Sequence, residues 1–178
     1  FDLVRMLSLE FGMDLNDRLR PAASAKQDFV FEALTRLHGR ACLTASEVSA
    51  LLRTGHATGA NARWRTLHEL AVVAMFIAQH GQDFARRYLE HQVVEAFRAA
   101  LQYQEFCQFL GEAPLEDEEI DELKRSRNEL VDKYGSEYAE QYGWAAQALR
   151  TGRPNFAQIA SSVDMGHWSP YVRMACHG

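Results

Sequence analysis

Hydrophobic residues recur along the chain at intervals of three and four, the spacing of one face of an α-helix. The first segment shows this spacing in four apolar residues: Leu3, Met6, Leu7 and Phe11. It predicts a helix over residues 1–20 that ends before Pro21, because proline removes a helical hydrogen bond. No run alternates with a period of two, as strands would. The pattern therefore predicts an all-α protein.

The same periodicity places the other elements. Further helices are expected over residues 25–54, 60–79, 83–110, 116–133 and 155–163, with a last one from Ser169. Gly81 ends the third helix, and Asp83 can cap the fourth. We expect an irregular helical bundle forming a single all-helical domain, 1–178. Residues 1–24 are a candidate N-terminal appendage, and the aromatic residues of 134–144 are expected to close one end of the bundle.

The third predicted helix is apolar on all sides over residues 67–77, which indicates a central, buried helix. Four polar residues nevertheless occupy its first turns: Arg63, Arg65, His68 and Glu69. Arg65 and Glu69 are four residues apart and can pair, and His68 lies beside both. We expect this pair to be largely buried, so that Glu69→Ala would cost about 3–5 kcal/mol by stranding a charge.

This polar cluster has two interpretations. Ionisable groups at active sites are often placed in such surroundings, and the pKa of His68 is readily tuned across neutrality. Alternatively, the cluster is a buried ionic network that locks the helix to its neighbours. The accessibility of His68 discriminates them, because an active site needs a cleft that is open to water.

The fourth predicted helix offers supporting residues. Arg87, Tyr88 and His91 share one face, and Glu95 lies four residues beyond His91. If helices three and four fold into a hairpin around Gly81, these side chains can approach the cluster. The alternative is that His91 and Glu95 form a surface pair worth tenths of a kcal/mol.

The amino-acid composition limits the classes of function that the chain can have. The net charge is −5, so nucleic acid would have to bind through a local basic patch. Only three of the 19 basic residues are Lys, and the arginines favour bidentate contacts with carboxylate or phosphate. No signal peptide and no long apolar run is visible. The three cysteines are far apart, which argues against a disulfide framework. We expect a cytoplasmic protein without a membrane partner.

Metal chemistry finds little support in the sequence. His68 and Glu69 begin like a zinc-protease helix, but Val72 stands where the second histidine would be. The chain has no Glu-x-x-His motif, Gly-rich phosphate loop or evident Cys–His pairing. A site formed by His68, Glu69, His91 and Glu95 remains an alternative. We expect neither a metal nor another cofactor.

Two family resemblances follow from these residues. The segment from Leu51 to Ala71, with Arg-Trp-Arg-Thr-Leu-His-Glu at 63–69, resembles the signature of a bacterial domain family of unknown function. Residues 87–91 and 142–145 fit the same family. This resemblance spans roughly residues 45–178 and implies a helical bacterial protein.

More loosely, the chain resembles the higher-eukaryote-and-prokaryote nucleotide-binding superfamily. These small all-α domains are often dimeric, and many are metal-independent endoribonucleases of toxin and phage-defence systems. Their motif is an Arg followed, after four to six residues, by a His, and Arg63 and His68 have this spacing. Trp64 departs from the family's polar residue, and five positions separate the pair by about 140° around a helix. Arg173 and His177 lie where the motif is usual, but with too few residues between them.

Together these observations suggest a metal-independent ribonuclease or a degenerate relative. His68 would transfer the proton, Arg63 or Arg65 would stabilise charge on the phosphate, and Glu69 would orient His68. The alternative is a non-catalytic helical interaction or regulatory domain. The superfamily resemblance also suggests a homodimer, for which the 134–144 segment and the terminal helices offer apolar surface.

Overall fold

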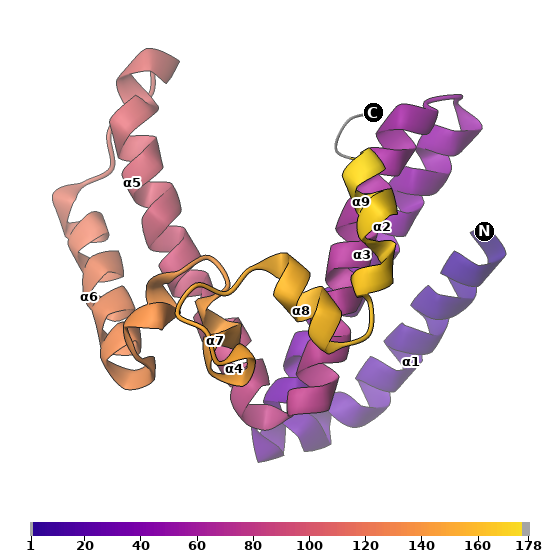
Figure 1. The fold of residues 1–178 in the computed structure, drawn as a ribbon, viewed down its shortest axis with the longest axis horizontal. Helices are drawn as coiled ribbons and strands as arrows, with labels where there is room; N and C mark the ends of the chain where they lie inside the picture. Colours follow the sequence, from indigo (N-terminus) through magenta and orange to yellow (C-terminus); the bar gives the residue numbers. More distant parts are fainter. Residues whose placement is uncertain (1, 176–178) are drawn as a thin grey trace. The chain divides into compact units, whose positions relative to one another are not determined.

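A computed structural model describes residues 2–175, and its regular secondary structure is entirely helical (Figure 1). The all-α prediction is confirmed. The longer helices are α1 (Asp2–Lys26), α2 (Phe29–Arg53), α3 (Ala57–His80), α4 (Gln82–Glu90), α5 (Gln92–Leu110) and α6 (Asp117–Tyr134). The shorter elements are η1 (Ser136–Ala139), η2 (Gly143–Ala145), α7 (Ala146–Leu149), α8 (Phe156–Ser162), η3 (Gly166–Trp168) and α9 (Ser169–Ala175).

The chain divides into two compact units. The first contains the residues up to Arg86 and those from Ala157 onward, and the second contains Arg87–Phe156. The single domain expected from the sequence stays a prediction. None of the helices within residues 2–175 is long and apolar enough to cross a bilayer.

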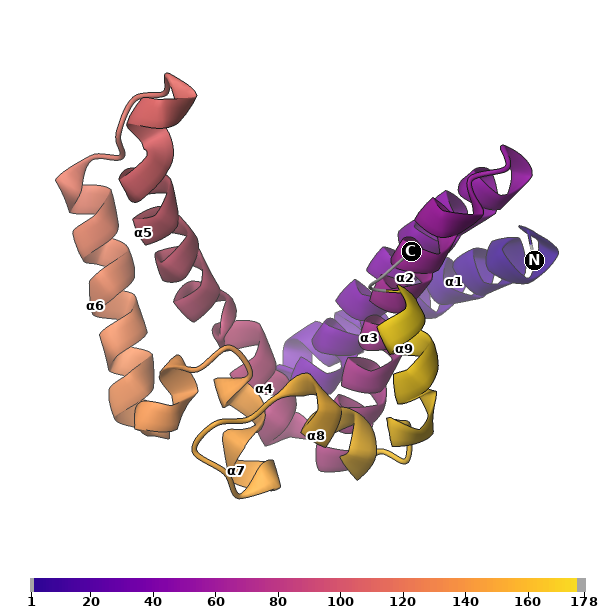
Figure 2. The same cartoon turned by 45° about the horizontal axis from the view of Figure 1, so that its top comes forward.

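In the first unit, α2 packs along α3, α1 packs on α2, and α9 packs on α3 (Figure 2). Asp28 begins α2 by accepting a hydrogen bond from the Phe31 amide at 2.9 Å, as an N-cap residue does. The Gln82 side-chain amide donates to the same Asp28 carboxylate at 2.7 Å. These bonds lower the pKa of Asp28, that from Gln82 most, and join the start of α4 to the start of α2.

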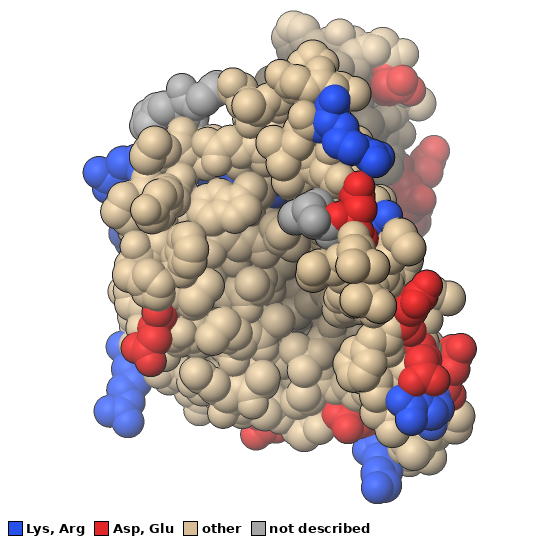
Figure 3. Space-filling model, turned by 90° about the vertical axis from the view of Figure 1, so that its right-hand side faces the viewer, with Lys and Arg blue, Asp and Glu red and all other residues tan. Residues whose placement is uncertain are grey.

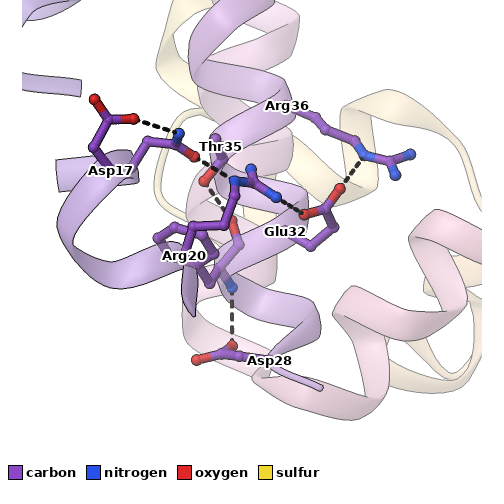
Figure 4. A network of polar contacts seen from close by, with 8 residues as sticks. Asp17, Arg20, Asp28, Glu32, Thr35 and Arg36 are labelled. Atoms are coloured by element: carbon purple, nitrogen blue, oxygen red, sulfur yellow. Dashed lines mark hydrogen bonds and ion pairs between the residues drawn. The ribbon is translucent and has the colours of Figure 1, made fainter. Parts of the chain in front are cut away.

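Polar contacts join α1 to α2. Figure 4 shows the Glu32 carboxylate of α2 between two guanidinium groups, that of Arg20 from α1 at 3.1 Å and that of Arg36 at 2.7 Å. Near the other end of α1, the Ser49 hydroxyl donates to Asp2. Between them, Gly12 lies so close to the His38 ring that a methyl group there would collide with it. α1 is therefore attached mainly through polar groups and a close backbone approach.

The expected burial of the third helix is only half right. Val72, Phe76 and Ile77 of α3 are fully buried, but Ala71 and Met75 are exposed. Over residues 70–78 the buried positions 70, 72, 76 and 77 fall within one half of the helix circumference and the exposed positions 71, 75 and 78 fall within the other, so this part of α3 buries one face and presents the other to water. α3 therefore contributes to the core of the first unit but is not covered by other elements on all sides.

The expected helix end at Pro21 is wrong, because α1 continues through Pro21 to Lys26. Proline leaves the carbonyl four residues earlier, that of Asp17, without its helical donor. Asp17 and Pro21 are both exposed, so water can solvate that carbonyl. α1 therefore tolerates a residue that would disrupt a buried helix.

In the second unit, α5 and α6 form a hairpin, η1 packs on α6, and η2 packs on η1 and on α7 (Figure 1). Gly111 ends α5 in the left-handed conformation, with φ of 75°. A capping box between Glu116 and Glu119 begins α6. The aromatic cluster of 134–144 contributes Tyr138 and Trp144, which are 1% and 3% exposed, to the core of this unit.

The single helix expected over 83–110 is interrupted at His91, between α4 and α5. The His91 imidazole is 4% exposed, and its Nε2 hydrogen points to the carbonyl oxygens of Tyr138 at 3.1 Å and Glu140 at 2.9 Å. Both acceptors lie more than forty residues away in the sequence. The helix is thus broken at His91, where the side chain makes a long-range contact that the local hydrophobic periodicity cannot reveal.

Candidate functional site

Arg63 is directed to the neighbouring helix α2. Its guanidinium forms an ion pair with the Glu47 carboxylate, and both side chains are 40% exposed. The partner lies sixteen residues earlier in the chain. Arg63 therefore ties α3 to α2 instead of joining His68.

Arg65 and Glu69 are paired, as predicted, with 2.9 Å between the Arg65 Nε and a Glu69 carboxylate oxygen. Their expected burial is wrong, because the two side chains are 46% and 34% exposed. Positions 65 and 69 are in line with the buried Val72 and Phe76 around α3 but lie nearer the start of the helix, where the two side chains are only partly covered. The pair is therefore screened by water and does not form a buried ionic network.

His68 is the buried member of the polar cluster and is 6% exposed. Its ring stacks on Trp64, with 5.7 Å between ring centroids, and lies 6.4 Å from the ring of Trp168. The two indoles also contact each other at 6.1 Å. Burial lowers the pKa of His68, and this outweighs the upward effect of the Glu69 carboxylate; His167 lowers it further. His68 is consequently neutral at pH 7 and enclosed by aromatic rings.

The expected supporting residues Arg87, Tyr88 and His91 belong to the second unit. The Arg87 guanidinium lies over the Tyr134 ring, 4.4 Å from its centre, and the Tyr88 ring meets Trp144 edge-on. His91 Nδ1 lies 3.8 Å from the Glu95 carboxylate. Burial lowers the pKa of His91 despite this carboxylate and the two carbonyls, so the ring is neutral at pH 7. These contacts give the three residues structural partners within their own unit.

Arg173 is exposed on α9, the helix that packs against α3. His177, its potential partner in the Arg–His motif, lies outside the described residues. Within residues 2–175, no group of three or more His, Cys, Asp or Glu side chains is placed to hold a metal ion.

Two contacts escaped the sequence analysis. Trp168 reaches His68 from a segment one hundred residues later, which no local pattern indicates. The Cys42 sulfur lies 3.7 Å from His38 Nε2, and the Ser8 hydroxyl lies 3.0 Å from the same nitrogen. The expectation that the chain has no Cys–His pairing is therefore wrong. The spacing of four residues between His38 and Cys42 was the available signal.

The exposed Arg65–Glu69 pair changes the expected effect of Glu69→Ala. We now expect this substitution to lower the free energy of unfolding by less than about 1 kcal/mol, because exposed i,i+4 pairs contribute only tenths. Urea unfolding of Arg65→Ala, Glu69→Ala and the double variant measures the coupling energy directly. A loss of about 3 kcal/mol or more for Glu69→Ala would restore the buried-network interpretation.

The structure does not bring the four residues of the polar cluster together into one group. Arg63 and Arg65 face different partners, and His68 lies under indole rings. A neutral imidazole is the form needed by a general base, yet a reacting oxygen would have to come within hydrogen-bond distance of it. Trp168, 37% exposed, is the more exposed of the two indoles that contact His68.

Comparison with known proteins places the chain in a family. No curated protein and no solved structure matches it. One family model matches residues 31–178, a range that contains the polar cluster and leaves α1 outside. The signature at 63–69 and the link to the nucleotide-binding superfamily stay predictions. Since the match covers most of the chain, the protein belongs to DUF5677, a family of unknown function.

Proposed function

We propose that this chain is a non-catalytic helical interaction module that forms a homodimer through the apolar face of α1. The observation that carries the proposal is the exposure of α1. Eight large apolar side chains of this helix are exposed by 38–70%: Leu3, Val4, Met6, Leu7, Leu9, Phe11, Met13 and Leu19. Ala23 is its buried residue.

The position of these residues favours helix-to-helix association. Leu3, Leu7 and Phe11 follow one another at intervals of four and form a stripe along α1. Contacts to α2 are made largely by the polar residues of α1, which leaves this stripe outward. Figure 3 looks onto the side of the first unit, where charged side chains stand mainly at the rim and the centre is largely uncharged.

The area fits a second copy of the chain. Six of the eight residues, all but Leu9 and Leu19, lie within one half of the circumference of α1. A fully exposed large apolar side chain presents on the order of 150 Å², so these six together present about 540 Å². A standard interface buries roughly 800 Å² on each partner. Two identical stripes can face each other across a twofold axis, because an isologous contact uses the same patch twice.

The state of the polar cluster also favours an interaction role. Arg63 and Arg65 are each paired with a glutamate, and His68 is covered by Trp64 and Trp168. A ribonuclease would need those groups open to RNA. The cluster instead has the contacts expected of residues that fix α3 against α2 and the C-terminal segment.

Light scattering coupled to size exclusion tests the dimer. We expect the mass of two chains at micromolar concentration, and the mass of one chain for Leu7→Glu/Phe11→Glu, because the new charges would be buried in the interface. Phe109→Glu is the matched control, since Phe109 is an apolar residue of α5 that is 88% exposed. A wild-type protein with the mass of one chain, or a dimer lost only in Phe109→Glu, would reject the proposal.

The second candidate is the metal-independent ribonuclease, and the lowered pKa of His68 favours it because a general base must be unprotonated. In that case RNA would be cleaved in the presence of EDTA to products with 2′,3′-cyclic phosphates. His68→Ala would abolish cleavage while the fold persists, whereas Trp168→Ala, which uncovers the ring, would accelerate it. If Arg173→Ala loses activity and His68→Ala keeps it, the catalytic group lies on α9.

A further inference from the structure

The second unit contains a pocket of about 530 Å³ that the preceding proposals do not use. It lies between the ends of α4 and α6 and the segment from η1 to Gly152. Three basic side chains line it, those of Arg87, Lys133 and Arg150, against one acidic side chain, that of Glu137. The chain as a whole has a net charge of −5. The excess of basic over acidic side chains is therefore specific to the lining of this pocket.

Two of the cations are held in place by an aromatic ring. The Arg87 guanidinium and the Lys133 ammonium lie 4.4 and 4.6 Å from the centre of the Tyr134 ring. The Tyr134 hydroxyl donates to Glu90 at 2.6 Å, and Lys133 also contacts this carboxylate at 2.9 Å. Tyr134 and Glu90 raise the pKa of Lys133 and keep it charged. The binding groups are thus ordered before a ligand arrives, which lowers the entropic cost of binding.

Arg150, the third basic residue of the pocket, has an unfavourable backbone conformation. Arg150 ends α7 with φ of 52° and ψ of 45°, the left-handed region in which glycine is preferred. A non-glycine residue is unfavourable there, because its β-carbon comes too close to the following carbonyl oxygen. Such strain is concentrated at binding sites and is expected where the side chain has a use. At this position, the side chain of Arg150 lines the pocket.

The polar groups of the pocket define the chemistry of its ligand. Two guanidinium groups and an ammonium are suited to a phosphate, which carries close to two negative charges at pH 7. Glu137, Gln147 and Thr151 also line the pocket and offer acceptors that suit hydroxyl groups. The volume exceeds what inorganic phosphate fills and lies within the range of small-molecule sites, about 300–1,000 Å³.

We infer that this pocket binds a phosphorylated small molecule whose body carries hydroxyl groups, as a sugar phosphate does. The inference concerns the second unit and is independent of the dimer proposed for α1. Arg150 and Arg87 contact the phosphate, and Glu137 accepts hydrogen bonds from the hydroxyl groups.

Isothermal titration calorimetry with inorganic phosphate, glycerol 3-phosphate, ribose 5-phosphate, ribose and citrate tests this inference. We expect ribose 5-phosphate to bind most tightly, inorganic phosphate at least about tenfold more weakly, and ribose not at all. Affinity should fall as salt is raised, because the contacts are ionic. Failure of both organic phosphates to bind at millimolar concentration would overturn the inference, as would tighter binding of citrate than of ribose 5-phosphate.

Arg150→Gly separates binding from folding. Glycine relieves the left-handed backbone, so the variant should have an unchanged or higher melting temperature while ribose 5-phosphate binds at least about tenfold more weakly. Arg153→Gln is the matched control, because Arg153 is an exposed arginine three residues away that does not line the pocket. Equal affinity of Arg150→Gly and wild type, or an equal loss in Arg153→Gln, would overturn the assignment.

Discussion

Phe76→Ala is expected to lower the free energy of unfolding by about 3–5 kcal/mol, because a buried phenyl ring is replaced by a cavity. Phe76 is 0% exposed in the core of the first unit. Its ring stacks on His80 at 4.0 Å between centroids and meets Phe84 edge-on at 6.1 Å. A loss of this size is a large fraction of the stability of an ordinary domain, about 5–15 kcal/mol. Urea unfolding followed by far-ultraviolet circular dichroism measures it.

Met75→Ala is the matched control, since Met75 precedes Phe76 on the same helix but is 40% exposed. We expect less than about 1 kcal/mol for it, because a substantial part of this side chain is already in contact with water. Similar losses for the two variants would contradict the one-sided burial of α3.

The second large effect is expected for Gly143→Ala. A β-carbon at this position would lie 2.5 Å from the Tyr138 carbonyl oxygen and closer still to that of Glu137. Both atoms are backbone, so η1 and η2 would have to separate. We expect a loss of about 1–3 kcal/mol in unfolding free energy, the usual effect of overpacking. The pocket should lose its shape with it.

Gly152→Ala provides the comparison within the same pocket. A β-carbon there would lie 3.7 Å from the Glu137 side chain, which is an ordinary contact. Thermal unfolding of both variants should therefore show a lower melting temperature for Gly143→Ala only. If Gly143→Ala were as stable as wild type, the close approach of η2 to η1 would not exist in solution.

Local patterns in the sequence predicted most of the helices. Gly81 and Gly111 end helices, as glycines just beyond a periodic run are expected to do. The predicted helix end at Pro21 was wrong because the effect of a proline depends on whether water can reach the carbonyl that it leaves without a donor. That access depends on tertiary packing, which the local sequence does not show. The break at His91 was invisible because its cause lies in the carbonyls of Tyr138 and Glu140.

The candidate site was predicted less well, for a related reason. The i,i+4 spacing identified the Arg65–Glu69 pair, but apolar neighbours on α3 suggested burial that only α2 and α9 could provide. Arg63 pairs with Glu47 and His68 packs on Trp168, both through tertiary contacts. The basic pocket was missed because its three cations, at positions 87, 133 and 150, are widely separated in the sequence.

The positions of the tryptophans in the two units have a spectroscopic consequence. The chain has three tryptophans, and the third, Trp144, belongs to the core of the second unit. Replacing Trp144 with Phe would leave an emission that originates only in the first unit, whereas replacing the other two would leave one that originates only in the second. The intrinsic fluorescence of the protein thus contains two separable optical reporters, and the order in which the units unfold can be observed without an attached dye.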